Sequence, residues 1–390
     1  MDSTEQKTEV AIVGAGAVGL AAALLLARDG RRVTLLGSPF VPRDGRTVAL
    51  LDGSWRLLEE LGVTPALAEN AAPLAVMRLV DDTGSLFRQP PVEFRATEVG
   101  LPAFGWNVEN AELVAALAAR VEATPGIVVR PAMVETVTLG NDAVTLAGPE
   151  LAPIRAALVV GADGRQSRMR QAAGIAAQEW RYPQIALTAI LGHRRDHHDT
   201  STEFHTRAGP CTLVPLPGRR SSLVWMMAPE AAERRAALDD AAFARAVETQ
   251  THSLLGAMTV IGARGRIPMG GLGVAHFAAS RIALVGEAAH VFPPIGAQGL
   301  NLGLRDVMAL RDALRAADDP GSAAAMAAYD RSRQGDVRLR TGAVDMLNRT
   351  LLTDLVPADL LRGAGLLALS RLGPLRRLVM KQGLAGGGRR

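Results

Sequence analysis

Two glycine-rich stretches contain the residues of this chain that are best suited to bind a charged ligand. The sequence GAGAVG spans residues 14–19, and VGEAAHVFPPIGAQGLNLGLRD spans residues 285–306. Glycine lets backbone N–H groups approach a ligand closely, and a helix dipole favours negative charge at its N-terminus. Each stretch lies between an apolar run and a segment with helical spacing. We therefore expect a large, electron-rich cofactor to lie against these turns.

The second stretch also carries side chains that could do chemistry. Gly286 and Glu287 form a glycine–acid pair after an apolar strand, and His290 is the one imidazole near this turn. A histidine there serves either as a proton carrier or as a structural hydrogen-bonding residue, and the sequence leaves both open. A Pro-Pro turn that begins at Pro293 stiffens the chain before a second glycine-rich step, residues 296–303, opens a helix.

The first stretch stands in the order strand, turn, helix, strand. An apolar, β-branched strand over residues 9–13 precedes GAGAVG, and a helical segment and a second strand follow within residues 20–36. This order around GxGxxG is that of a dinucleotide-binding fold. In such a fold Gly14 makes the tight turn, Gly16 lets a pyrophosphate approach, and Gly19 lets the helix pack closely on the strand.

One residue of that fold is missing. The second strand of a dinucleotide-binding unit usually ends in Asp or Glu, which holds the adenosine ribose. Here the strand ends Leu36-Gly37-Ser38, and the first acidic residue after it is Asp44. The ribose hydroxyls are therefore held by Ser38, by backbone groups or by Asp44.

Two further polar turns are candidates for cofactor contacts. GADGRQSRMR, residues 161–170, follows a short apolar strand over Leu158–Val160 and places Asp163 between two glycines. Such an acid suits a ribityl or pyrophosphate contact, or a plain left-handed turn. Arg46 precedes a helix that we expect over Val48–Leu61. Because a cation is unfavourable at a helix start, Arg46 either contacts a phosphate or ring of the cofactor or is simply solvated.

Length and element order predict two interleaved domains. At 390 residues, 48% of them hydrophobic, the chain exceeds one typical domain and can bury a large core. Residues 181–268 alternate strands and turns around a helical segment, which is typical of an antiparallel sheet with flanking helices. We expect an α/β fold in which a Rossmann-like unit is interleaved with this sheet and followed by C-terminal helices. The strands expected in the sheet are Ile185–Leu191, Thr202–His205, Cys211–Leu216, Ser221–Met227 and Met258–Ile267.

Composition and charge exclude several classes of function. Aromatic residues make up 4% of the chain, too few for a surface that stacks nucleic-acid bases. The net charge of +4 includes seven basic residues and no acid between Leu360 and Arg390, so the rest carries −3 (+4 less 7), which argues against a nucleic-acid partner. Residues 10–27 are apolar enough to suggest a membrane span, but the glycines of GAGAVG explain them better. The histidines of residues 193–199 suit a solvated hairpin turn, and we expect no metal site.

The start of the chain and its cysteine content bear on the compartment. MDSTEQKTEV is polar and mixed in charge, unlike a secretory signal peptide, and Cys211 is the single cysteine. We expect a cytoplasmic protein. The Leu- and Arg-rich segment Leu360–Lys381 either docks peripherally on the inner face of an anionic membrane or on a partner protein, or packs on the body of the protein with its basic side solvated.

The three glycine motifs together resemble a known family. GAGAVG, GADGRQSRMR and GEAAHVFPPIGAQGLNLGLRD stand in the order found in the single-component flavin-dependent aromatic hydroxylases, the superfamily of para-hydroxybenzoate hydroxylase. DGRTVALL, residues 44–51, and LNLGLRD are most similar to the ubiquinone-biosynthesis hydroxylases of that superfamily. The resemblance implies an FAD-binding domain, an antiparallel substrate domain and a helical tail. The FAD-binding domain would comprise residues 1–71, 95–180 and 269–350. The substrate domain would comprise residues 72–94 and 181–268, and the helical tail residues 351–390.

The resemblance also implies a set of site residues. Glu287 stands where the family usually has Asp, and would hold the ribityl chain from a slightly shifted backbone. Asp163 would contact both FAD and the nicotinamide nucleotide, with Arg170 closing its motif, and His290 is the tentative catalytic residue. The cofactor-binding residues implied are Gly14, Gly16 and Gly19 at the ADP moiety, Arg46 beside the flavin, Asn110, Asp163, Gly286, Glu287, Pro293, Gly296, Gly299 and Asn301.

The activity implied is that of an FAD-dependent monooxygenase in ubiquinone biosynthesis. It would hydroxylate the ring of a polyprenylated phenol through a flavin C4a-hydroperoxide, with O₂ as co-substrate and NAD(P)H or an electron-transfer protein as reductant. Other ubiquinone-biosynthesis proteins would be its partners. Two alternatives stay open: hydroxylation of a small soluble aromatic, and an FAD-bound, non-catalytic scaffold of a biosynthetic complex.

Overall fold

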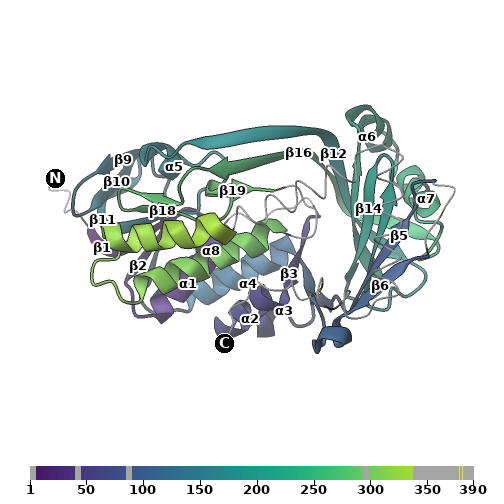
Figure 1. Ribbon diagram of the computed structural model, residues 1–390, viewed down its shortest axis with the longest axis horizontal. Coiled ribbons are helices and arrows are strands. Elements are labelled where there is room, and N and C mark those ends of the chain that lie inside the picture. The colour runs from purple at the N-terminus through teal and green to yellow at the C-terminus, as the bar shows by residue number, and fades with distance from the viewer. Residues whose placement is uncertain are drawn as a thin grey trace.

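Two large sheets and the helices beside them make up the protein. The structure, a computed structural model, describes residues 6–39, 45–84, 90–292 and 298–336, together with Arg377 and Met380. Helices α1, α4 and α8 lie side by side across one sheet, and α6 and α7 flank the other at the opposite end of the molecule (Figure 1). These helices are α1 (Ala17–Arg28), α4 (Asn110–Glu122), α6 (Pro229–Ala236), α7 (Asp240–Gln250) and α8 (Gln298–Leu314).

The first sheet brings the three glycine-rich motifs together. Its parallel strands run in the order β18-β11-β1-β2-β8, with Val13 opposite Gly161 and Gly161 opposite Leu284. Because the carboxyl ends of parallel strands meet at one edge, the turns after β1, β11 and β18 are neighbours. The strands are β1 (Gln6–Val13), β2 (Val33–Leu36), β8 (Ile127–Arg130), β11 (Leu151–Gly161) and β18 (Ile282–Leu284), and antiparallel β9 (Thr136–Leu139), β10 (Val144–Gly148) and β17 (Ala278–Ala279) extend the sheet.

The second sheet is largely antiparallel, in the order β19-β16-β12-β15-β14-β13-β5-β6. Two of its strands, β12 and β16, run the length of the molecule and connect its two ends (Figure 1). Strand β5 comes from far earlier in the chain and pairs with β13 in parallel, Phe204 opposite Val80. The strands are β5 (Val76–Asp81), β6 (Val92–Arg95), β12 (Ala177–His193), β13 (Thr200–Thr206), β14 (Gly209–Leu216), β15 (Arg220–Met227), β16 (Met258–Val274) and β19 (His290–Val291).

A small third sheet contacts the second one. Its order is β3-β7-β4, and the Asn107 side chain on β7 donates to the Pro215 carbonyl oxygen of β14 at 2.8 Å. Residues 323–336 are helical after α8. The remaining elements are β3 (Thr47–Leu51), β4 (Ala71–Pro73), β7 (Gly105–Glu109), α2 (Asp52–Glu60), α3 (Thr64–Leu67), α5 (Arg168–Ala172) and the 3₁₀ turns η1 (Ala96–Val99) and η2 (Gly286–Ala288).

The expected fold class is confirmed, while one element was wrong. The chain has an α/β fold with a Rossmann-like parallel sheet and a separate antiparallel sheet. The helix expected over Val48–Leu61 is in fact strand β3 followed by α2 from Asp52, because Leu50 pairs with Trp106 of β7. Apolar spacing alone cannot separate a short buried strand from the first turn of a helix. The domain division remains a proposal, which the pairing of β5 with β13 suits.

Residues 10–27, once a candidate membrane span, form β1, the glycine turn and α1. Among the described residues no helix is both long and apolar enough to cross a membrane. The predicted tail helices, residues 351–390, lie outside the described residues apart from Arg377 and Met380.

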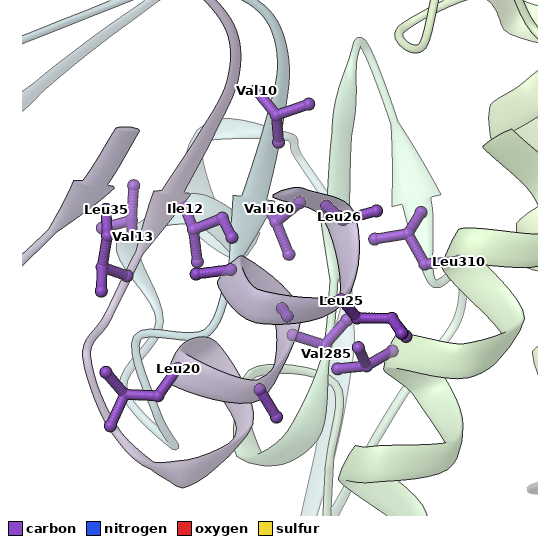
Figure 2. Close-up of a cluster of buried hydrophobic side chains, with 14 of the residues drawn as sticks. Val10, Ile12, Val13, Leu20, Leu25, Leu26, Leu35, Val160, Val285 and Leu310 are labelled. Atoms are coloured by element: carbon purple, nitrogen blue, oxygen red, sulfur yellow. The ribbon is translucent and has the colours of Figure 1, made fainter. Parts of the chain in front are cut away.

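The main core lies between the first sheet and α1. Leu25 of α1 is fully buried, and Figure 2 draws it in the same cluster as Val285 after β18 and Leu310 of α8. Ile12 and Val160, on adjacent strands, complete the sheet side of this cluster (Figure 2). The helix that begins within GAGAVG is thus held on both sides by apolar packing.

Leu25→Ala is expected to lower the free energy of unfolding by about 2–5 kcal/mol, since it removes buried methyl groups and leaves a cavity. Denaturant unfolding with FAD in excess measures it. Val128→Ala is the control, because Val128 lies on edge strand β8 and is 38% exposed. Equal losses in the two variants would contradict the proposed core.

Candidate functional site

The surrounding backbone requires glycine at two of the three glycine positions of GAGAVG. Gly14 has φ +111°, and a Cβ there would lie 2.2 Å from the carbonyl oxygen of Ala162. A Cβ on Gly19 would lie 1.9 Å from the carbonyl oxygen of Gly14. These two positions therefore pack the turn after β1 against the turn after β11 and leave no room for a side chain.

Gly16, in contrast, faces open space. A Cβ on Gly16 would meet no atom within 4 Å, and its φ of −78° suits any residue. Gly16 is the N-cap of α1, no side chain caps that helix, and its first turn contains no acid. Backbone N–H groups and the helix dipole are thus presented to an anion such as a pyrophosphate.

The conformation of Gly37 explains the missing acid. Gly37 has φ +118°, which side-chain-bearing residues rarely adopt, and a Cβ there would lie 3.5 Å from the backbone nitrogen of Ala15. An Asp or Glu at this position would be strained by this backbone conformation. Ser38 is exposed beside it, and Asp44 lies outside the described residues. The ribose contact remains a prediction.

The carboxylate of Asp163 shapes its own turn. One oxygen accepts a hydrogen bond from Ser167 Oγ at 2.5 Å, and the other accepts from the Met169 backbone N–H at 3.1 Å. Ser167 in turn caps α5 by accepting from the Arg170 N–H. Any contact of Asp163 with FAD or a nicotinamide nucleotide would be made in addition to these bonds.

Arg170 joins the middle motif to the late one. Its guanidinium is buried and donates to the carbonyl oxygen of Ala288 and to that of Arg165, both at 2.9 Å. Since η2 contains Ala288, this side chain holds the turn after β11 against the turn after β18. The closing base of GADGRQSRMR thus acts between the two turns.

The late turn packs against α1 through Val18. Gly286 has φ +61°, and a Cβ there would lie 3.1 Å from Val18 Cγ2, while one on Gly303 of α8 would lie 2.7 Å from the same atom. The absence of side chains at both glycines lets α8 approach α1. Glu287, between them in the chain, is exposed and has no hydrogen-bond partner in the described part of the protein. Its carboxylate is available to accept from a ligand's hydroxyl groups.

His290 lies in a buried ionic network. Its Nε2 is 2.6 Å from Asp306 Oδ2, and the two side chains are 1% and 0% exposed. The same oxygen of Asp306 accepts from the Gly286 N–H at 2.9 Å, and Oδ1 accepts from Arg333 Nε at 2.7 Å. Burial acts to lower the pKa of Arg333, but the charge of Asp306 raises it above its usual value. This arrangement supports the structural interpretation of His290; a role in proton transfer remains a prediction.

The remaining predicted residues gather around β3. Asn301 of α8 accepts from the Leu51 N–H at 2.9 Å and donates to the Ala49 carbonyl at 2.8 Å, so its amide holds β3 against α8. The backbone N–H of Asn110 donates to the carbonyl oxygen of Arg46 at 3.0 Å. Arg46 is exposed at the start of β3, and the structure therefore places it next to Asn110.

Among the described residues, the start of α8 has free space at Gly299. Gly299 is exposed and a Cβ there would meet no atom within 4 Å, and the first turn of the helix contains no acid. A negatively charged ring edge would be favoured there by the helix dipole. Pro293 and Gly296, also predicted to line the flavin, lie outside the described residues.

The histidine cluster at residues 193–199 is only in part the solvated turn that we expected, since residues 194–196 and 198 are exposed but His193 and His197 are not. His193 is 7% exposed and its Nε2 lies 3.0 Å from Ser221 Oγ, because β12 pairs there with β15; burial lowers its pKa. His197 bonds to the Leu216 carbonyl, and His198 is 85% exposed. Across the described residues no group of three His, Cys, Asp or Glu side chains could hold a metal ion.

Sequence reasoning missed Asp306, Arg333 and Asn107. All three are buried, 0%, 3% and 1% exposed, and each bonds to residues far away in the chain. The one local signal was an acid on the apolar side of the helix after LNLGLR. Its partners could not be inferred, because they come from two other parts of the chain.

Known proteins are similar in sequence to this chain over almost its full length. A family model described as FAD binding domain matches residues 7–338. The ubiquinone hydroxylase UbiL of Rhodospirillum rubrum is 33% identical over 393 residues, which cover 98% of this chain and 90% of that protein. The 3-demethoxyubiquinol 3-hydroxylase of Escherichia coli is 34% identical over 396 residues, covering 98% and 99%.

Solved structures share the fold. The p-nitrophenol 4-monooxygenase PnpA of Pseudomonas putida superposes with a TM-score of 0.80 at 20% identity, over 99% of this chain and 100% of its own. HpxO of Klebsiella pneumoniae, solved with FAD and uric acid, superposes with a TM-score of 0.76 at 19% identity, over 97% of both chains. At these identities the likeness shows the fold alone.

Gly16→Ala is expected to leave folding intact and to weaken FAD binding about tenfold or more, a loss of about 1.4 kcal/mol, because its methyl group projects where the pyrophosphate approaches. FAD titration and thermal unfolding without FAD measure the two effects. Gly19→Ala is the contrast: its Cβ overlaps the Gly14 carbonyl, so it should lower the melting temperature of the FAD-free protein as well. An unchanged FAD affinity in Gly16→Ala would refute this placement.

Asp306→Asn is expected to destabilise the protein by about 3–5 kcal/mol, because the buried guanidinium of Arg333 would lose its fully buried counter-charge and keep only the more exposed Asp336. Denaturant unfolding of the FAD-bound protein measures it. Asp312→Asn, on the same helix, is the control and should change stability by less than about 0.5 kcal/mol, since Asp312 is 60% exposed and pairs with its neighbour Arg311. Similar values for both variants would contradict the network's importance.

Proposed function

This chain belongs to the FAD binding domain family, and on that premise we propose that it is an FAD-dependent monooxygenase of ubiquinone biosynthesis that hydroxylates the aromatic ring of a polyprenylated phenol. The observation that carries the proposal is the meeting of three glycine turns at one sheet edge in a chain that aligns over its length with two ubiquinone-pathway hydroxylases. Its substrates are accordingly an aromatic compound and O₂.

The described residues fit both the ADP half and the flavin half of an FAD molecule. The open N-terminus of α1 at Gly16 suits the pyrophosphate, and the exposed carboxylate of Glu287 suits the ribityl hydroxyl groups. The start of α8 at Gly299 suits the electron-rich edge of the flavin ring. Reduced FAD supplies the activation of O₂ and the transfer of one oxygen atom to the ring. NAD(P)H or an electron-transfer protein supplies the electrons.

The protein's own part is to hold the substrate and keep water away. Ala186, Met226 and Met269 form an apolar cluster on the second sheet, with Val224 and Ile267 packed against it. Each methylene group that a prenyl chain buries on such a surface contributes about 0.8 kcal/mol, so hydrocarbon contacts would dominate the affinity. This apolar face favours a lipophilic substrate over a small soluble aromatic one.

The C-terminal tail remains a proposed contact with a membrane or a partner. Met380 packs in a small cluster with Val92, Phe94 and Phe104, while Arg377 is exposed. At Met380 the tail therefore lies on the body of the protein, next to β6. We propose that the basic residues of the tail, of which Arg377 is exposed, attract anionic lipid or an acidic partner protein.

Loss of this protein from its organism should cause a prenylated phenol that lacks one hydroxyl group to accumulate, because the next step of the pathway would have no substrate. Mass spectrometry of the quinone fraction measures this and also names the ring position. Restoring the wild-type chain should remove the intermediate, whereas the Gly16→Ala variant should remove it only partly. An unchanged quinone pool would rule the proposal out, and an accumulated soluble aromatic would favour the alternative substrate class.

A further inference from the structure

The strand β13 divides its side chains between the two faces of the second sheet. Phe204 packs in the cluster that contains Phe243 of α7, so that face is covered by helix. Glu203 and His205, its neighbours in the chain, point to the other face, because successive side chains of a strand alternate. Thr212 of β14 lies opposite Glu203 and shares that face.

This second face turns toward the elements of the proposed flavin site. Ser222 of β15 belongs to it, since the register from Ser222 through Val214 of β14 gives it the same side as Thr212. Ser222 Oγ accepts a hydrogen bond from Thr47 Oγ1 of β3 at 2.8 Å. Thr47 directly follows Arg46, the residue expected beside the flavin. We refer to this side of the sheet as the inner face.

Glu203 and His205 form a pair of opposite titratable groups on the inner face. His205 Nε2 lies 2.9 Å from Glu203 Oε1, and the other carboxylate oxygen accepts from Thr212 Oγ1 at 3.2 Å. The side chains are 19% and 25% exposed. Burial acts to raise the pKa of Glu203, but His205 lowers it below its usual value, so the carboxylate stays ionised.

The surroundings of this pair are partly apolar. Leu79 of β5 lies opposite Glu203, and Val224 and Met226 of β15 occupy the next strand but one on the inner face, while Asp81 lies opposite His205. A charged pair that is largely buried costs desolvation energy that an apolar pair would not. A substrate with a hydroxylated ring and a hydrocarbon chain matches a face that carries both polar groups and apolar side chains.

The arrangement leaves His205 with one nitrogen available. A carboxylate only accepts hydrogen bonds, so the contact with Glu203 requires the proton of a neutral His205 on Nε2. The lone pair then lies on Nδ1, for which the described residues show no hydrogen bond; Nε2 meets Glu203 as a close ion-pair contact, without the geometry of a hydrogen bond. A histidine whose tautomer is set by a carboxylate is the usual form of a general base.

We propose that His205, oriented by Glu203, contacts a ring hydroxyl group of the aromatic substrate and accepts its proton. The inference rests on the proposed function. The O–H bond breaks, an N–H bond forms on Nδ1, and the electron pair stays on oxygen, which enriches the ring for attack on an electrophilic oxygen atom. Glu203 is a positioning residue that stabilises the imidazolium formed.

Other ionisable groups around His205 are few. Asp81 lies opposite it on β5, on the same face, and one of its oxygens accepts from Thr83. Asp82 follows, with a carboxylate that lies 2.9 Å from His252 Nε2.

The test uses FAD-loaded wild type, His205→Gln and Glu203→Gln, with Glu93→Gln as matched control. Glu93 pairs with Arg78 at 2.8 Å on the opposite face of the same sheet. The first readout is optical: a farnesylated 4-nitrophenol, whose anion is yellow, is bound to each protein, and its ionisation is followed against pH. The second is hydroxylation of a farnesylated phenol against reductant consumed, measured with the FAD content of each variant.

Wild type and Glu93→Gln should ionise the bound nitrophenol at lower pH than free solution does, and His205→Gln should abolish that shift. Hydroxylation by His205→Gln should fall about 10²-fold in kcat/KM or more with FAD content unchanged, and Glu203→Gln should lie between. An equal shift in His205→Gln and wild type, or no shift in wild type, overturns the inference. Failure of wild type to hydroxylate any farnesylated phenol while the shift is present counts against the proposed function alone.

Discussion

The carboxylate of Asp306 is the interaction on which the rest of the site depends. It is fully buried and accepts from the Gly286 backbone, from His290 and from Arg333. A buried charge is tolerated only where it is paired and hydrogen-bonded, so these contacts cannot be exchanged cheaply. They hold α8 in one position relative to the turn after β18. Two other residues of α8 connect it to neighbouring elements. Asn301 bonds to β3, and Gly303 leaves room for Val18 of α1.

The glycine motifs separate into positions that the fold needs and positions that it leaves open. Gly14, Gly19 and Gly286 are confined by neighbouring backbone or side chains. Gly16 and Gly299 meet nothing within 4 Å, although each lies in the same motif as a confined glycine. The described part of the fold gives no packing reason for a missing side chain at the open positions, and the proposed cofactor contacts would supply one. The two lie at the starts of α1 and α8, where backbone donors face outward.

The second sheet has a comparable division between its two faces. One face is covered by α6 and α7 and is apolar throughout the cluster around Phe243. The inner face carries apolar side chains as well, together with the polar residues Asp81, Glu203, His205, Thr212 and Ser222. A face with both kinds of side chain suits a substrate that is mostly hydrocarbon with one oxygenated ring. The first sheet would then hold the cofactor and the second would hold the substrate, with β3 between them.

The sequence by itself determined the class of fold, the order strand–turn–helix–strand around GAGAVG and the family, because glycine spacing and apolar runs act locally on the backbone. Only the tertiary structure decided which groups meet. Residues 48–51 became a strand because β7 was available to pair with them, and Asp163 proved to bond within its own turn. The partners of Asp306 come from two separate parts of the chain, and the facing of His205 depends on strand register. Long-range pairing is selected by burial and register, and neither can be read from local residue spacing.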